Sequence, residues 1–594
     1  MISNSVSNKN WIFKKYDEQD VLFFKENYSL DEITSKLLSI RKIKKENVQT
    51  FLTPSIRNFL PNPKIINDME KSTIRTLQAI SKKNKIGIFG DYDVDGAAAT
   101  ALLANYFSNI NLPFEIYIPD RKKEGYGPSV DSFKKLINKG VKIIFTVDCG
   151  TLSFEAIDFA FKNKIDVIVL DHHQSEINLP LAHSIVNPNR IDDKSELNYL
   201  CAAGVTFMFL VALNKELRMN NLFENRNIKE PNLLEYLDLV TLGTICDVVP
   251  LVGLNRAIVF QGMKIIKTKK NLGLKTLFDI CGIETRPNIY HIGYMLGPRI
   301  NAGGRVGKSS HGANLLLNNN PKDVFKIATE LDQFNKERQF LEKDVLDKIL
   351  KIIDNTSLDP VIVLSGKDWH EGVLGIVASR IKDKFNKPVV LISIDKELGK
   401  ASARSIFGFD IGSVIISATQ ENILIKGGGH KMAGGFSIKV DKIDEFKKFI
   451  LKKFSRINED IKKEKLLFLD SVIAPTAINL EFYNKVHSLA PFGSGNPEPK
   501  FVIENVKSVN NKIIKDKHIK SVLIGSDGST IKTIAFNSID NEIGAYLLKK
   551  DNKLFNIAGK LSLNEWRGQS NVEFIIDDIS VNKTFKKMVP SSIG

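Results

Sequence analysis

From residue 85 onward, short apolar runs rich in β-branched residues alternate with longer stretches of helical character. The strand-like runs are KIGIF, FEIYI, KIIFTV and DVIVL, and the helix-like SFEAIDFAFKNK lies between the last two. Alternation of strands and helices at this spacing is typical of a parallel sheet with helices on both faces. The sequence therefore predicts a doubly wound α/β lobe over residues 81–322.

The rest of the chain divides into segments of different character. Residues 1–80 are predicted to form a helical lead-in, and the charged segment 323–356, which has no proline, a connecting helix. Strand-like DPVIVLSG and KPVVLISI flank helix-like EGVLGIVASRI, which predicts a second α/β lobe over 357–465. Residues 466–594 contain five short alternating runs with polar turns. An OB-fold barrel is the most economical interpretation of these runs, and another small β domain is the alternative.

Composition limits the class of protein. The four cysteines among 594 residues show no C-x-x-C spacing, which argues against a disulfide framework and favours a reducing compartment. The N-terminus has no apolar segment typical of a signal peptide, and no apolar run approaches the ~20 residues that span a bilayer. We expect a soluble, cytoplasmic protein.

The chain carries a formal charge of +16, from 84 Lys and Arg against 68 Asp and Glu. Such an excess favours a polyanionic partner, most simply nucleic acid. The alternative is a lysine-rich composition along the whole chain that leaves solvated lysines everywhere. Charge therefore supports a nucleic-acid partner only together with other signals.

Acidic residues follow three of the predicted strands. KIGIFG leads into Asp91, Asp93 and Asp95, FTV leads into Asp148, and DVIVL leads into the sequence DHH at 171–173. The carboxyl ends of parallel strands meet at one edge of the sheet, where ligands bind. Carboxylates crowded there would repel one another unless a divalent cation neutralised them.

Each of these signals has an ordinary structural explanation when taken alone. An isolated D-x-D is usually a helix cap or a solvated turn, and an isolated histidine is usually satisfied in a core. Three separate strand ends together with a histidine pair make coincidental capping a poor explanation. Carboxylate and imidazole ligands suit Mn²⁺ or Mg²⁺, and Cys149 is the one ambiguous thiol beside them.

These residues resemble the successive motifs of the DHH phosphoesterase superfamily. Further segments resemble its single-strand-specific exonucleases, and together they run in order from about residue 85 to 575. The segments are GDYDVDG, YIPDRKKEGYG, TVDCGT, DHH, IVNPN, LCAAGVTF, TICDVVPL, GPRINAGGR, WHEGVLGIVASRI, ASARSIFGFDIG, GGGHKMAGGF and PFGSGNPEP. GGGHKMAGGF corresponds to the DHH-associated domain of the superfamily.

The resemblance implies a set of metal ligands: Asp91, Asp93, Asp95, Asp148, Asp171, His172 and Asp247. Asp148 would bridge two divalent ions, and Asp91 would either bind directly or support its loop. Asp148, His172 and His173 are the catalytic candidates. His173 would either contact the scissile phosphate or donate a proton to it.

An exonuclease also has to recognise the end of its substrate strand. Arginine suits phosphate because its planar fork makes bidentate, charge-assisted hydrogen bonds. The phosphate- and DNA-binding candidates are Arg121, Arg299, Arg305, Ser402, Arg404 and His430. In the barrel, Phe492, Phe536 and Trp566 are candidates for stacking on bases, although aromatic residues in a small barrel more often belong to its core.

The activity implied by the resemblance is 5′-to-3′ exonuclease action on single-stranded DNA, by two-metal hydrolysis to 5′ mononucleotides, in DNA repair and recombination. A helicase and a single-strand-binding protein are the protein partners considered, and the chain is expected to be a monomer. Three alternatives are a phosphodiesterase for short substrates, a pyrophosphatase, and a non-catalytic DNA-binding scaffold. The predicted barrel argues against the first two, and the complete ligand set argues against the third.

Overall fold

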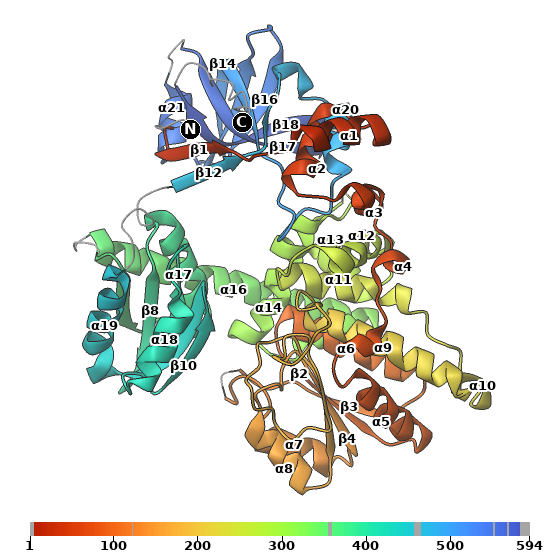
Figure 1. The fold of residues 1–594 in the computed structure, drawn as a ribbon. Helices are drawn as coiled ribbons and strands as arrows, with labels where there is room; N and C mark the ends of the chain where they lie inside the picture. Colours follow the sequence, from red (N-terminus) through yellow and green to blue (C-terminus); the bar gives the residue numbers. More distant parts are fainter. Residues whose placement is uncertain are drawn as a thin grey trace, which may run out of the picture.

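The computed structural model describes residues 5–121, 123–284, 286–354, 359–456, 465–549, 553–566 and 569–581. Figure 1 shows a large α/β lobe, a second α/β lobe to its left, and a β-barrel above them. The long helix α16 (Pro321–Asp354) joins the two α/β lobes. None of the described helices is long and apolar enough to cross a membrane.

The first lobe contains a parallel sheet of order β3-β2-β4-β5-β6. Its strands are β2 (Ile86–Gly90), β3 (Phe114–Tyr117), β4 (Ile143–Val147), β5 (Asp166–Leu170) and β6 (Ser184–Val186). The four predicted strands are confirmed, whereas β6 is too short to give a sequence signal. The chain leaves β2 for β3 on one side and returns to β4 on the other, so the carboxyl ends of β2 and β4 form the crevice where such sheets bind ligands.

Helices cover both faces of this sheet, because alternate strand residues point to opposite sides. On one face, Phe89, Ile144 and Val169 join a core with α7 (Val130–Asn138) and α8 (Phe154–Lys162). On the other, Ile88 and Phe145 belong to the largest core of the lobe. Its helices are α5 (Met69–Ser81), α6 (Val94–Asn109), α9 (Ala202–Met219), α11 (Leu237–Cys246), α12 (Gly253–Lys267), α13 (Leu272–Ile280), α14 (Gly297–Val306) and α15 (His311–Leu317).

The second lobe is a mixed sheet of order β10-β11-β9-β8-β7, with helices packed on it. The predicted strand–helix–strand unit is confirmed as β7, α17 and β8. The elements are β7 (Ile362–Lys367), α17 (Glu371–Phe385), β8 (Val389–Asp395), β9 (Leu398–Arg404), α18 (Ile411–Gln420), β10 (Lys426–His430), β11 (Ala433–Lys439) and α19 (Ile443–Ser455).

The C-terminal region forms a closed five-stranded barrel. The strands follow one another in the order β14-β15-β16-β18-β17, and β17 pairs back onto β14. All five predicted runs are confirmed as strands: β14 (Phe501–Ile514), β15 (His518–Ile524), β16 (Thr530–Ala535), β17 (Phe555–Trp566) and β18 (Gln569–Ser580). The helices α20 (Leu480–His487) and α21 (Glu542–Leu548) and the short strand β13 (Ser471–Val472) lie beside it.

The N-terminal lead-in differs from the expected run of helices. It begins with a strand, β1 (Lys9–Phe13), which pairs in parallel with β12 (Lys465–Leu469) beside the barrel. The Trp11 side chain is buried, and its Nε1–H donates to Asp578 Oδ2 at 2.9 Å. A strand whose partner lies some 450 residues away leaves no local pairing signal. The helices α1 (Glu18–Tyr28) and α2 (Glu32–Ile40) then bury Phe24 and Leu37 in the core of the barrel.

A buried arginine joins the barrel to the first lobe. Arg256, in the first turn of α12, donates to the carbonyl oxygens of Phe51, Leu489, Ala490 and Pro491 at 2.8–3.3 Å. No ion pair of Arg256 occurs among the described residues. Its guanidinium therefore ties together the N-terminal segment, α12 and the segment that leads into PFGSGNPEP.

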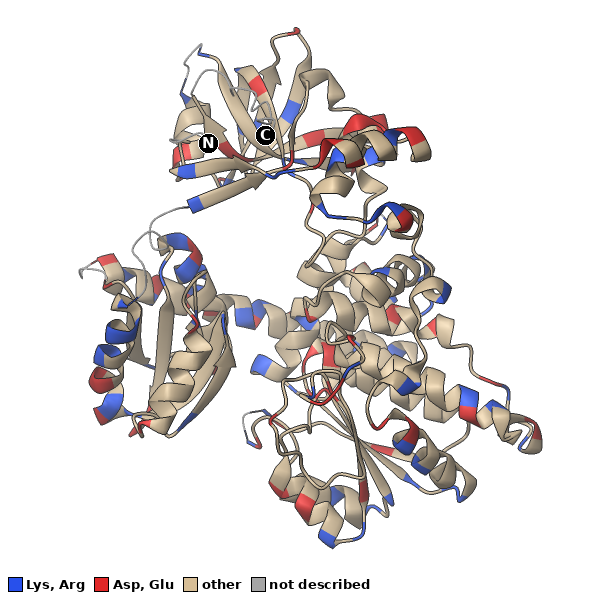
Figure 2. Ribbon diagram, in the orientation of Figure 1, with Lys and Arg blue, Asp and Glu red and all other residues tan. Residues whose placement is uncertain are grey.

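Figure 2 shows Lys and Arg on all the lobes, without a single basic region. This distribution agrees with the alternative explanation of the net charge, a lysine-rich composition along the whole chain. Acidic residues, by contrast, gather in the loops above the carboxyl ends of the first sheet (Figure 2).

Candidate metal centre and phosphate site

The turn after β2 holds three carboxylates in a fixed arrangement. Asp91 is buried, and Asp93 caps α6 by accepting from Gly96 N at 2.9 Å. Asp95 lies in the first turn of α6 and accepts from the backbone N–H groups of Ala202 and Ala203, at 2.6 and 3.0 Å. Those N–H groups belong to the free N-terminus of α9, which attracts negative charge. The helix ends therefore hold part of the carboxylate cluster in place.

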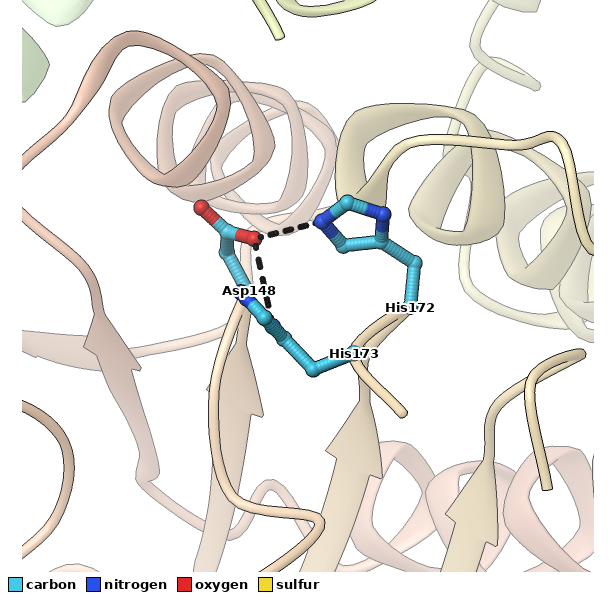
Figure 3. A group of neighbouring side chains, drawn as sticks. All are labelled: Asp148, His172 and His173. Atoms are coloured by element: carbon cyan, nitrogen blue, oxygen red, sulfur yellow. Dashed lines mark ion pairs between the residues drawn. The ribbon is translucent and has the colours of Figure 1, made fainter. Parts of the chain in front are cut away.

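Asp148 follows β4 in a left-handed backbone conformation, with φ +62°. Aspartate tolerates this region better than most residues, and such local strain is concentrated at functional sites. Its Oδ1 lies 3.2 Å from His172 Nε2 and 4.0 Å from His173 Nδ1 (Figure 3). Two neighbouring strand ends thus direct their side chains at one point.

Asp171 was expected to be a metal ligand, but its contacts in the structure give it a different role. Its Oδ2 accepts from the backbone and the hydroxyl of Thr151, at 3.1 and 2.6 Å. Its Oδ1 accepts from the backbone N–H groups of His172 and His173 and lies 2.8 Å from His173 Nδ1. Because both oxygens are occupied by protein donors, Asp171 orients the histidine pair and is not positioned as a ligand.

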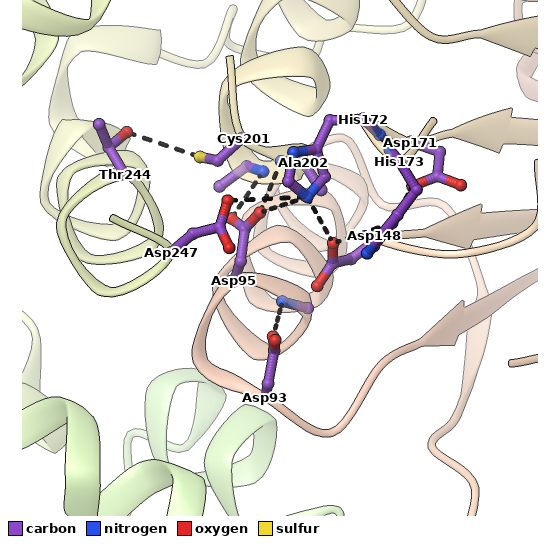
Figure 4. Close-up of polar contacts among 12 residues, drawn as sticks. Asp93, Asp95, Asp148, Asp171, His172, His173, Cys201, Ala202, Thr244 and Asp247 are labelled. Carbon is purple, nitrogen blue, oxygen red and sulfur yellow. Dashed lines mark hydrogen bonds and ion pairs between the residues drawn. The ribbon is translucent and has the colours of Figure 1, made fainter. Parts of the chain in front are cut away.

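Three overlapping sets of side chains each offer ligand atoms that lie within 4.8 Å of one another, and Figure 4 shows all their members except Asp91. They are Asp91 with Asp93 and Asp148, Asp95 with His172 and Asp247, and Asp148 with His172 and His173. Asp247 comes from the end of α11, far from the strand ends in sequence. Six expected ligands are therefore brought together, with His173 beside them.

The electrostatics of these side chains fit bound divalent cations. Burial, reinforced by Asp93, raises the pKa of Asp91 well above its ordinary value, and burial with the neighbouring carboxylates does the same to Asp148. Burial raises the pKa of Asp247 to about 8, with Asp95 and Asp93 adding to it. Asp91 Oδ1 is buried and finds no hydrogen-bond donor among the described residues. Such crowding is relieved by a cation.

Cys149 is not suited to join the ligands. Its side chain is buried, and its thiol donates to Val147 O. Burial raises the pKa of the thiol well above its ordinary value, and nearby carboxylates act in the same direction. A group that stays protonated is a poor metal ligand.

Asp247 gives a test that depends on pH and metal removal. A carboxyl whose pKa rises to about 8 on folding binds its proton more tightly in the folded state, so metal-free stability should fall between about pH 4 and pH 8. We expect Asp247→Asn to unfold at a higher temperature than wild type at pH 8 in chelator, with little difference at pH 5. Mn²⁺ should raise the melting temperature of wild type far more than that of the variant. Thermal unfolding measured across this pH range would contradict the assignment if both proteins behaved alike.

Tyr126 lies at the site although it was not among the candidate residues. Its hydroxyl donates to Asp148 O at 3.2 Å and lies 3.4 Å from His173 Nε2. Asn187 was also not singled out, and its Nδ2–H donates to His173 O at 2.8 Å. Tyr126 lies within YIPDRKKEGYG and Asn187 within IVNPN, which are two of the motifs that carry the family resemblance. Their position in these motifs is the sequence signal that could have identified them as site residues.

Two of the candidate arginines lie near the carboxylates. The Arg121 guanidinium lies 4.9 Å from the ring centre of Tyr92, the residue between Asp91 and Asp93. Arg305 Nη1–H donates to Gly372 O of the second lobe at 3.0 Å. Burial and the neighbouring Arg121 lower the pKa of Arg305 to about 10, so it stays charged at neutral pH. Both guanidinium groups therefore lie close to the loop that carries Asp91 and Asp93.

The other candidates differ in their placement. Arg299 is held away by Asp332 Oδ1 at 2.9 Å and Met295 O at 2.7 Å, so its expected role in binding phosphate is not supported by this arrangement. Ser402 and Arg404 lie side by side on β9 against Gly375 of α17, where an added Cβ would lie 2.7 Å from Arg404 Nη2. His430 is exposed at the end of β10. None of the described contacts connects it to the carboxylates.

The three aromatic candidates of the barrel also differ in their burial. Phe492 is half-buried against the core of the barrel, which is the ordinary structural role. Phe536 is 50% exposed, and its ring makes an edge contact with His518. The side chain of Trp566 lies outside the described part of the structure.

The fold and this site define a DHH-type phosphoesterase. Residues 85–244 match the family model for the DHH family N-terminal domain, and residues 358–456 match that for the DHHA1 domain. Residues 469–578 match the RecJ OB domain. The chain belongs to the RecJ family.

Curated relatives and solved structures agree with this assignment. The single-stranded-DNA-specific exonuclease RecJ of Haemophilus influenzae is 34% identical, over 87% of this chain and 91% of its own. The corresponding Bacillus subtilis protein is 31% identical, over 97% of this chain and 71% of its own. RecJ of Thermus thermophilus in complex with Mn²⁺ superposes with a TM-score of 0.80 at 26% identity, covering 97% of this chain and 80% of that one.

Proposed function

We propose that this chain is a metal-dependent exonuclease that degrades single-stranded DNA from the 5′ end to 5′ mononucleotides. The observation that carries the proposal is the cluster of buried carboxylates and imidazoles at the switch point of the sheet, with Arg121 and Arg305 beside it. A metal-bound phosphodiester needs this combination of ligands and cationic groups. The relatives named as single-stranded-DNA-specific exonucleases support the choice of substrate.

Two divalent cations, Mn²⁺ or Mg²⁺, would be held by the overlapping ligand sets, and Asp148 belongs to two of the three sets. When bound, they would activate a water molecule and offset charge on the oxygens of the phosphodiester. Asp91 and Asp93 would complete one site, and Asp95, His172 and Asp247 the other. The solved RecJ structures with Mn²⁺ and Mg²⁺ support the choice of metal.

The protein itself supplies a positioned imidazolium. Burial opposes charge on His173, but the hydrogen bond to Asp171 and the nearby carboxylates outweigh it and raise its pKa to about 9. In the metal-free protein these contacts favour the protonated form of His173, which would bind a phosphate oxygen or give a proton to the leaving oxygen. Arg121 and Arg305 would hold the terminal phosphate and so set the direction of digestion.

The lobes around the crevice would exclude duplex DNA. The second lobe contacts the first where Arg305 meets Gly372, and the barrel lies above both (Figure 1). A strand that passes between them would have to be single. From the family resemblance we further propose a role in DNA repair and recombination in the cytoplasm, as a monomer that a helicase and a single-strand-binding protein supply with substrate.

The proposal is tested with single-stranded DNA oligomers labelled separately at each end. We expect mononucleotides to appear from the 5′ end only, with Mn²⁺ or Mg²⁺ and not with chelator. The rate should fall sharply on a blunt duplex of the same sequence. A series of shorter oligomers serves as the comparison, since rapid cleavage confined to di- and trinucleotides would instead indicate a short-substrate phosphodiesterase. Tight binding without metal-dependent cleavage would indicate a scaffold.

A further inference from the structure

Two tyrosines that the catalytic site does not use form an exposed stacked pair. Tyr290 is 61% exposed and Tyr294 is 74% exposed. Their ring centres are 5.2 Å apart, with an angle of 23° between the ring planes. They lie at a π-helical segment, His291–Leu296, and such segments occur frequently at functional sites. Two neighbouring exposed rings offer flat faces on which nucleic acid bases can stack.

The pair lies beside the helix end that carries Asp247. The π-helical segment packs on the last turn of α11, where Cys246 Sγ–H donates to Ile292 O at 3.7 Å. An added Cβ on Gly293 would lie 3.4 Å from Ile245 Cγ2. Asp247 caps this same turn of α11. The tyrosines therefore lie on the helical segment that packs against the end of α11, the helix that Asp247 caps.

The helix connects the tyrosines to Arg305. Residues 289–306 are helical throughout, with the π-helical segment leading directly into α14. Ile292, Leu296 and Ile300 are buried on one side of it. The other side of the helix carries Tyr290, Tyr294, Asn301 and Arg305, whose positions in the chain are separated by four, seven and four residues. One helix face thus carries a phosphate-binding candidate at one end and two aromatic rings at the other.

The spacing along this face suits a nucleic acid strand. Tyr294 and Arg305 are separated by about 16 Å, at about 1.5 Å per helical residue. A stacked strand advances about 3.4 Å per nucleotide, so this length corresponds to at most about five nucleotides. Aromatic rings bind bases of any sequence because every base has a flat face.

We propose that Tyr290 and Tyr294 form a stacking platform for bases of the single strand, about three to five nucleotides from the end held at Arg305. This inference rests on the proposed exonuclease function and adds a second contact region to it. The platform supplies affinity for strands long enough to reach it. It plays no part in hydrolysis of the terminal bond.

The test compares the double variant Tyr290→Ala/Tyr294→Ala with Tyr290→Phe/Tyr294→Phe, which keeps both aromatic faces. Phe161→Ala is the matched control, because Phe161 is 61% exposed on α8, at the far end of the first lobe (Figure 1). Binding is measured in chelator with 5′-phosphorylated oligo(dT) of 2 and 20 nucleotides. The 20-mers carry a single 2-aminopurine, placed at each of the first eight positions in turn.

We expect the alanine double variant to bind the 20-mer roughly 5- to 150-fold more weakly, the factor associated with one lost base–aromatic stack. Binding of the dinucleotide should not change. Fluorescence of 2-aminopurine should be quenched near positions three to five by wild type, by the phenylalanine variant and by Phe161→Ala, and not by the alanine variant.

Equal affinity of all four proteins for the 20-mer, or quenching that survives in the alanine variant, would overturn the platform. The alternative occupant, a protein partner on the exposed rings, would give that result. Failure of the proposed function is a separate outcome, because wild type would then not release mononucleotides from the 20-mer when Mn²⁺ is restored.

Discussion

Asp148→Asn is expected to lower metal-dependent cleavage of single-stranded DNA by more than about 100-fold. Asp148 belongs to two of the three ligand sets, and its side chain is almost fully buried. Substitutions of groups that only support metal ligands typically cost about 10- to 100-fold, so loss of a shared ligand should exceed that range. The rate of mononucleotide release and the affinity for Mn²⁺, measured by calorimetry, should fall together.

The backbone at Asp148 allows loss of the ligand to be separated from misfolding. Asparagine tolerates the left-handed conformation observed there, whereas alanine carries a penalty of about 1–2 kcal/mol. We expect both variants to lose activity, and Asp148→Ala alone to lose stability as well. Asp131→Ala, at an exposed acidic residue of α7 in the same lobe, is the matched control. Retention of activity by Asp148→Asn would contradict the assigned site.

Arg256→Met is expected to lower the free energy of unfolding by about 3 kcal/mol or more. The substitution removes the side-chain donor of Phe51 O and Ala490 O at a buried junction, whereas Leu489 O and Pro491 O keep a donor in Asn496 Nδ2. Each unpaired buried group costs about 1–3 kcal/mol. Burial lowers the pKa of Arg256 to about 9, so the guanidinium stays charged at neutral pH and its hydrogen bonds are charge-assisted. The loss should therefore exceed that of a neutral contact.

Thermal unfolding and limited proteolysis would measure this effect. Arg256→Lys should recover little, because a single ammonium cannot reach the carbonyls that the planar fork reaches. Arg57→Gln, at an exposed arginine of α4 (Ile56–Phe59) in the adjoining N-terminal segment, controls for loss of charge alone. If Arg256→Met and Arg57→Gln unfold at the same temperature, Arg256 does not hold the barrel to the first lobe.

Much of the architecture is determined by local sequence. Strands β2, β4 and β5 are apolar runs bounded by acidic residues, and their order and spacing predict where their carboxyl ends meet. The five barrel strands are likewise visible as alternating runs. These features are local because side-chain periodicity and turn residues act over a few positions.

The candidate site was predictable only in part. Asp91, Asp93, Asp95, Asp148 and His172 follow from strand ends, whereas Asp247 ends a helix and was found only through the motif TICDVVPL. Asp171 has the expected position in the chain, yet its oxygens are taken by Thr151 and the histidine pair. Which partner a carboxylate selects depends on neighbours that the chain brings from elsewhere.

Local patterns along the chain are enough to predict the two α/β lobes, the barrel and the residues that gather at the strand ends. Tertiary structure alone decided that β1 pairs with β12, that Arg299 is held by Asp332, and that Tyr126 stands beside His173. Hydrophobic periodicity depends on residues that are close together in one segment, so it can be recognised in the sequence. Hydrogen bonds and ion pairs between distant segments form only after packing of the core has brought those segments together.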